Sequence, residues 1–160
     1  MQELKRPTLS VSQANDPVHA FVHGLQVAID TGNADHFNRR FAQDVLWGSP
    51  FGAVAVGFDQ IHAIHARMFA SVVPVKGAAR YVVEHAQFPT ADVAVAYVRR
   101  VAAQPHQTSP PLEPQSTQPS PARPGSFDEL ALLVLVQRDG QWWLAAAQHV
   151  PDRRDVYARP

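Results

Sequence analysis

Hydrophobic residues recur at helical spacing in the first part of the chain. Asp16-Pro17 supplies an N-cap acceptor followed by a proline, which is favoured at the first helical position. The hydrophobic stripe that follows ends at Thr31-Gly32, a good C-terminal stop. Its members are Val18, Phe21, Val22, Leu25 and Ile29. This pattern predicts an amphipathic helix of about four turns.

Two further helices are predicted before the main run of strands. A short one begins at an Asn33 cap and continues through Phe41, with Asn38, Arg39 and Arg40 on its outer face. The other covers about residues 59–73. Its hydrophobic stripe contains Ile61, Ile64, Met68 and Val72, and His65 lies on the same stripe.

Strand patterns separate and follow these helices. A hairpin is predicted at 45–56, with the turn at 48–52, and two long strands at 79–88 and 93–102. Residues 129–137 are hydrophobic on both alternations, which indicates a central strand covered on both faces. Asp139-Gly140 predicts a hairpin to a last strand, on which Gln148 shares a face with Trp142, Leu144 and Ala146.

This order of elements predicts an α+β fold in which three helices pack on an antiparallel (mixed) sheet. A single domain is expected over 15–152, with flexible tails at 1–14 and 153–160. Within it, residues 104–126 contain half of the 14 prolines and almost no other hydrophobic residues. We expect that segment to be a Pro-rich loop inserted between two strands, with a proline-motif ligand for a partner protein as the alternative.

Composition removes several classes of function. The 160 residues include 14 that are Lys or Arg and 14 that are Asp or Glu, so the chain has no excess of positive charge to attract nucleic acid. The N-terminus lacks a signal-peptide pattern, and no hydrophobic run is long enough to cross a membrane. We therefore expect a cytoplasmic protein. The absence of Cys excludes disulfides and thiolate chemistry, and no glycine-rich phosphate loop or dinucleotide motif occurs.

Several stretches carry a resemblance to a known group of proteins. They are the segment from Thr31-Gly32-Asn33 to Phe51-Gly52, the segment 57–65, and the ending Asp139-Gly140-Gln141-Trp142. The chain resembles the nuclear-transport-factor-2-like superfamily, and within it the SnoaL-like and SgcJ/EcaC-type bacterial proteins. The resemblance implies a strongly curved sheet wrapped around the helices, giving a cone with an internal cavity. Members include isomerases, cyclases, dehydratases, hydrolases and non-catalytic association domains, so it implies no single reaction.

The steroid isomerases of that superfamily offer a residue-by-residue test. The matching register puts their general-base aspartate at Ser49 and their oxyanion-hole tyrosine at Leu25. Proton abstraction beside a carbonyl needs a base and a hydrogen-bond donor. Ser49 does not supply the base, and Leu25 does not supply the donor. The steroid-isomerase mechanism is therefore disfavoured. Whether the chain is an enzyme stays open.

His65 and Ser49 are the candidate catalytic residues. His65 is either a core histidine with satisfied nitrogens or a pocket donor, acceptor or base. Ser49 has an alternative role in the Gly48-Ser49-Pro50 turn. The candidate ligand-binding residues are Trp47, Phe41, Met68, Tyr97, Trp142 and Gln148.

Two functions from different classes fit these patterns. The first is a protein that binds a small, largely apolar molecule in the cone, with any reaction being cofactor-independent acid–base chemistry. The second is a non-catalytic association module. Under either, a homodimer through the outer sheet face is expected, because so hydrophobic a sheet face must be covered. No cofactor is expected. No metal site is expected either, because the His19/His23 and His62/His65 pairs lack a placed third ligand such as His85 or His149.

Overall fold

The computed structural model describes residues 6–13, 16–103 and 128–152. The Pro-rich segment 104–126 and the tail 153–160, for which a loop and a flexible end are predicted, lie outside the described residues. The helices are α1 (Pro17–Thr31), α2 (Ala34–Asn38) and α3 (Phe58–Ala70). The strands are β1 (Phe41–Gly48), β2 (Val54–Val56), β3 (Ala79–Thr90), β4 (Val93–Ala102), β5 (Glu129–Arg138) and β6 (Gln141–Pro151).

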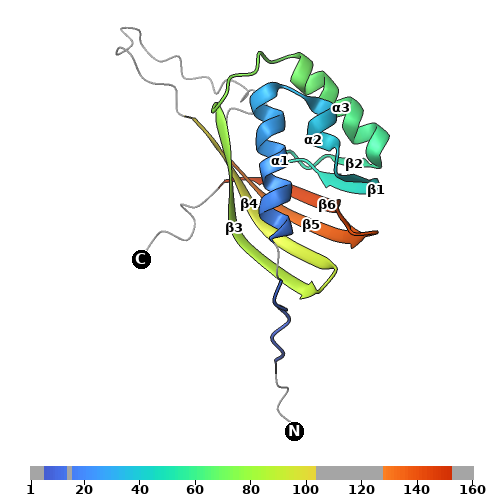
Figure 1. Ribbon diagram of the computed structural model, residues 1–160. Helices are drawn as coiled ribbons and strands as arrows, with labels where there is room; N and C mark the ends of the chain where they lie inside the picture. Colours follow the sequence, from blue (N-terminus) through green and yellow to red (C-terminus); the bar gives the residue numbers. More distant parts are fainter. Residues whose placement is uncertain (1–5, 14–15, 104–127, 153–160) are drawn as a thin grey trace.

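The strands form one sheet in the order β2-β1-β6-β5-β4-β3. The pairing of β1 with β6 is parallel and every other pairing is antiparallel, so the sheet is mixed. The three helices lie against one face of this sheet (Figure 1). The α+β class and the meander of the last four strands are confirmed. No helix among the described residues is long and apolar enough to cross a membrane.

The first helix begins and ends where the sequence predicts. The Asp16 carboxylate accepts a hydrogen bond from the backbone N–H of His19 at 3.0 Å, which caps the N-terminus. Gly32 ends the helix in the left-handed conformation, with φ of +65°. Its inner face buries Val18, Phe21, Val22, Leu25 and Ala28.

The second helix is shorter than predicted. It ends at Asn38, and Phe41 pairs with Leu144 as the first residue of β1, so the prediction of a helix through Phe41 is wrong. The Arg40 carbonyl accepts a hydrogen bond from the backbone N–H of Leu144 at 2.7 Å, which ties the chain to the sheet at that point. The outer position predicted for Asn38 is also wrong, because this residue is completely buried.

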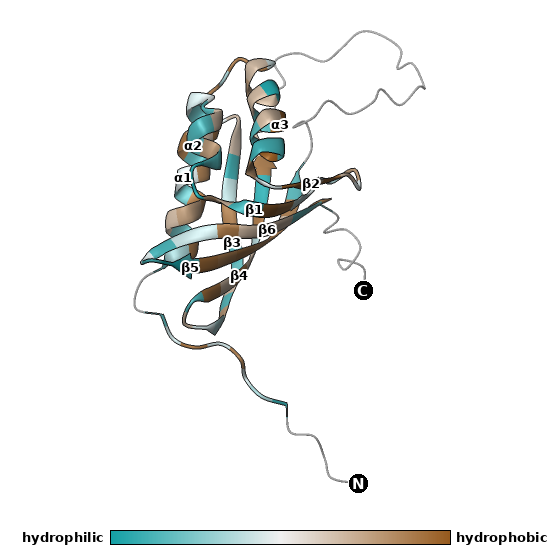
Figure 2. Cartoon of the chain, turned by 90° about the vertical axis from the view of Figure 1, so that its right-hand side faces the viewer, coloured by the Kyte–Doolittle hydropathy of each residue, from teal (hydrophilic) through white to brown (hydrophobic). Residues whose placement is uncertain are grey.

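The core lies between the helices and the inner face of the sheet. From the strands it receives Val45, Ala94, Val98, Leu133, Leu135 and Leu144. The strand β5 carries a long hydrophobic stretch, whereas the helices alternate between polar and hydrophobic positions (Figure 2). This pattern agrees with a central β5 whose inner residues are buried and whose outer residues, such as Leu132, are half-buried.

A β-bulge in β6 reverses its alternation halfway along the strand. Leu144 pairs with Leu135 and Ala146 with Val134, so Ala145 is an extra residue. Beyond it, Ala147 and His149 face the helices, and Gln148 lies on the outer face. The prediction that Gln148 shares a face with Trp142 and Leu144 is therefore wrong. One inserted residue exchanges the two faces of everything that follows it.

Residues 6–13 run beside the end of β3. The backbone N–H of Val11 donates to the Phe88 carbonyl at 2.9 Å, and the Gln13 side-chain amide donates to the Ala91 carbonyl at 2.9 Å. These contacts place this part of the N-terminal segment next to the turn between β3 and β4.

Candidate functional site

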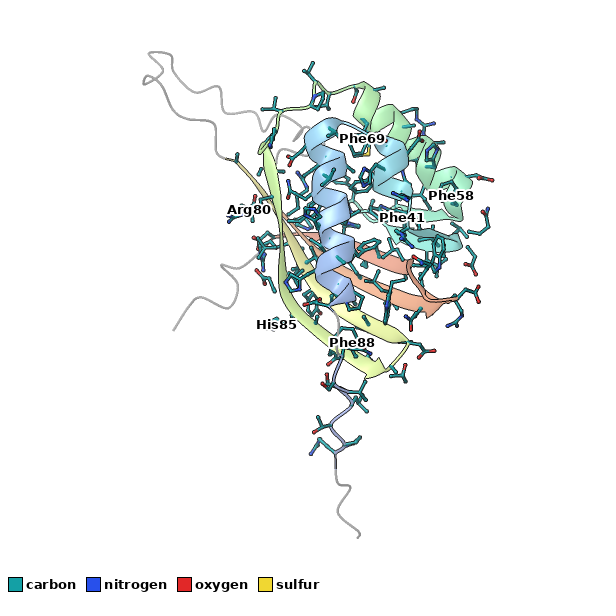
Figure 3. The ribbon with its side chains drawn as sticks, in the orientation of Figure 1. Phe41, Phe58, Phe69, Arg80, His85 and Phe88 are labelled. Atoms are coloured by element: carbon teal, nitrogen blue, oxygen red, sulfur yellow. The ribbon has the colours of Figure 1, made fainter. Side chains whose placement is uncertain are left out.

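A pocket of about 290 Å³ opens between the ends of α1 and α2, α3 and the inner face of the sheet. Its hydrophobic wall consists mainly of Ile29, Phe37, Trp47, Met68, Phe69 and Val72. Its polar lining consists of His65, Tyr81, Arg100, Glu129 and His149. Phe41 and Phe69 lie between the helices and the sheet in this region, whereas Arg80 and His85 project from the other side of β3 (Figure 3).

His65 is held in place by Asn38. The His65 Nδ1 atom lies 2.7 Å from Asn38 Oδ1, and both residues are buried. The Asn38 amide nitrogen donates to the Ala34 carbonyl at 2.7 Å, which fixes the orientation of the side-chain amide. Because the amide oxygen can only accept, His65 Nδ1 must carry the hydrogen. In the neutral ring, Nε2 is then left with its lone pair.

The surroundings of His65 keep its ring neutral. Phe37 lies edge-on to it with ring centroids 4.9 Å apart, and Trp47 does so at 4.8 Å. Burial in this aromatic shell lowers the pKa of His65 to about 4, and the neighbouring His149 and His62 act in the same direction. At neutral pH the imidazole is thus a hydrogen-bond acceptor and a weak base rather than an acid.

His149 lies against the same tryptophan. Its ring centroid is 4.2 Å from that of Trp47, and its Nδ1 is 3.0 Å from the Gly48 carbonyl oxygen. A carbonyl only accepts, so Nδ1–H donates. Burial also lowers the pKa of His149, although the Gly48 carbonyl and Glu129 oppose that shift.

The remaining polar lining comes from three neighbouring strands. Arg100 and Glu129 face each other across β4 and β5 and form an ion pair with an N–O distance of 3.2 Å. Tyr81 on β3 pairs with Arg100, and burial raises the pKa of Tyr81 well above its usual value. Its hydroxyl therefore stays protonated. The two opposite charges cancel, so the lining has no net charge at neutral pH.

Four of the predicted site residues come together here. His65, Trp47 and Met68 line the pocket, and Phe41 lies behind Trp47 with the two rings stacked at 5.5 Å. Phe41 is itself buried and supports the wall rather than forming it.

The other predicted site residues lie elsewhere. The Ser49 hydroxyl accepts hydrogen bonds from the backbone N–H groups of Phe51 and Ala53, which gives it a turn role. Gln148 and Tyr97 are on the outer face of the sheet. Trp142 lines a separate cleft of about 240 Å³ with Phe21, Arg39 and Gln141.

Sequence reasoning did not find Asn38, Tyr81, Arg100 or Glu129 as site residues, and named His149 only as an unplaced metal ligand. Asn38 precedes two arginines in the sequence, and nothing in that pattern indicates that its side chain is buried at a site. His149 faces the pocket only because of the bulge at Ala145, which alternation alone does not reveal. Among the described residues, no three His, Asp or Glu side chains gather closely enough to hold a metal ion.

No protein-family model matches the chain, and no curated protein matches it by sequence. Solved structures do match it. One is assigned as a calcium/calmodulin-dependent protein kinase type II association domain from Thiobacillus denitrificans, at 15% identity and a TM-score of 0.65, covering 89% of this chain and all of that one.

Two other solved structures extend the comparison. An NTF-2 like protein of unknown function from Shewanella oneidensis has 13% identity and a TM-score of 0.60, covering 84% of this chain and 96% of that one. A protein assigned as a scytalone dehydratase from Novosphingobium aromaticivorans has 11% identity and a TM-score of 0.60, covering 86% and 83%. At such low identity the likeness shows the fold alone. The chain has the nuclear transport factor 2-like (NTF2-like) fold.

Proposed function

We propose that the protein binds a small, largely apolar, uncharged molecule in the pocket beneath α3, as a SnoaL-like protein. The observation that carries this proposal is a hydrophobic pocket of about 290 Å³ into which a few polar groups converge. Ligand pockets are commonly about 300–1,000 Å³ with mostly hydrophobic walls, so this one fits a molecule of one or two rings. The lack of net charge in the polar lining favours an uncharged ligand, because a buried unpaired charge would be costly.

His65 is the group on which any reaction in this pocket would depend. With Nδ1–H bonded to Asn38, its Nε2 can accept a proton from a bound molecule. Such a reaction would be cofactor-independent acid–base chemistry of the isomerase, cyclase or hydrolase type. The steroid-isomerase mechanism remains disfavoured, because Leu25 belongs to the core and Ser49 caps a turn.

Screening for ligands by unfolding temperature tests the proposal, since a molecule that prefers the native state raises it. Candidate compounds are neutral one-ring and two-ring molecules. His65→Ala should weaken binding of a hit, or abolish its turnover, while the variant still folds. His85→Ala, on the outer face, is the matched control. Hits that bind His65→Ala as well as they bind the native protein would remove His65 from the function.

A second function is favoured by the outer face of the sheet. Leu46, Val54, Val56 and Val150 are on that face and are between 45% and 67% exposed. A homodimer that covers this face would fit either a ligand-binding protein or a non-catalytic association module. Two of the similar structures are assigned as association domains.

A further inference from the structure

Hydrogen bonds to the protein determine the tautomers of the two imidazoles in the pocket. Asn38 Oδ1 can only accept from His65 Nδ1, and the Gly48 carbonyl can only accept from His149 Nδ1. The Asn38 orientation is not free, because its amide nitrogen is already committed to the Ala34 carbonyl. Each neutral ring is left with an Nε2 lone pair on its other side.

Both Nε2 atoms are available to a ligand. Neither has a hydrogen-bond partner among the described residues. Neither is sealed off, since neither is among the completely buried side-chain polar atoms that lack a hydrogen-bond partner in the described chain. His65 and His149 line the same pocket, and each imidazole contacts the Trp47 ring. Both imidazoles therefore lie beside the same indole ring.

We propose that the pocket selects flat, neutral molecules that carry hydrogen-bond donors, phenols above all, whose O–H groups donate to the Nε2 atoms of His65 and His149. This inference rests on the proposed function and deepens it by naming the class of ligand. The ring of the ligand would pack against the hydrophobic wall, and its hydroxyl groups would donate hydrogen bonds to the two imidazoles. An ether or a hydrocarbon of the same shape leaves the acceptors desolvated and unpaired, which is the costly case.

The test compares two probes that differ by one donor. 2-Naphthol and 2-methoxynaphthalene have the same ring system, but only the first has an O–H group. We expect 2-naphthol to bind about tenfold more tightly by fluorescence titration, the effect of one hydrogen bond to an otherwise unpaired buried acceptor. His65→Phe and His149→Phe should each lower this preference, and the double variant should abolish it. His85→Phe is the matched control and should keep it.

Nitrogen NMR on the unliganded protein gives a second, independent measurement. Both histidines should show the hydrogen on Nδ1, and an Nε2–H tautomer at either ring would overturn the proposal even if every variant failed to fold. Equal binding of the two probes, or an unchanged preference in the double variant, would also overturn it while leaving the proposed function standing. Failure of both probes to bind would count against the proposed function itself.

Discussion

Asn38 and His65 form a buried hydrogen-bonded pair that joins α2 to α3, with 2.7 Å between Oδ1 and Nδ1. No charge is involved, and both residues are buried, so His65 Nδ1–H and Asn38 Oδ1 depend on each other for this hydrogen bond.

Asn38→Leu should destabilise the protein by about 2–3 kcal/mol, because it leaves the His65 Nδ1–H buried without an acceptor. His65→Phe should reduce the stability by less than Asn38→Leu, since a phenyl ring can pack within the same aromatic shell. Urea denaturation of both variants and of the double variant gives the coupling free energy. We expect the double variant to be more stable than the two single effects predict, by about 1 kcal/mol. Strictly additive effects would show that the pair contributes no coupling.

The pH dependence of stability should follow His65. Its pKa is lowered to about 4 in the folded protein from 6.5, so between these values the unfolded chain binds a proton that the folded one does not. Stability is therefore complete above about pH 6.5 and falls as the pH drops towards 4. The full loss from this ring is about 3 kcal/mol, and His149 adds to it in the same direction.

The measurement is the free energy of unfolding between pH 5 and 7, where most carboxylates stay ionised. His65→Phe should show a shallower slope than the native protein over this interval. A slope unchanged by that substitution would show that His65 titrates normally.

Gly32→Ala should destabilise the protein more than Gly140→Ala. Both glycines have positive φ, +65° and +73°, so both substitutions carry a backbone cost of about 1–2 kcal/mol. Only at Gly32 would the new methyl group meet a neighbour, the Pro74 ring at 2.9 Å. Thermal unfolding should therefore show an additional loss of about 1 kcal/mol at Gly32. Equal losses would mean that the Pro74 loop moves aside freely.

The outer face of the sheet should mediate self-association. Val56→Lys places a charge on that face, and in a symmetric dimer it does so twice. We expect the dimer dissociation constant to rise by about 100-fold or more, measured by sedimentation equilibrium. Val73→Lys, at an exposed position beyond α3, should leave it unchanged. A native protein that is monomeric at all concentrations would contradict the prediction.

The sequence predicted what depends on periodicity and end signals. The three helices, the hairpins and the central β5 were all visible as repeats of hydrophobic positions or as turn residues. The fold class followed from their order, and His65 was visible because it interrupts a hydrophobic stripe.

What could not be predicted depends on irregular backbone and on distant contacts. Asn38 is buried against His65, to which it offers a hydrogen-bond acceptor, and that partner is 27 residues away along the chain. Just after the end of α2, the Arg40 carbonyl accepts a hydrogen bond from Leu144, a residue more than a hundred positions away. Pairings of this kind leave no local pattern around either residue.

Because of the bulge at Ala145, β6 contributes side chains to two different sites. Before it, Trp142 projects into the cleft beside α1, and after it, His149 projects into the pocket under α3. Removing that single alanine would restore the regular pleat, turning the imidazole outward and Gln148 inward. The position of an imidazole in the pocket thus depends on one inserted alanine, which acts through the register of the strand and not through its side chain.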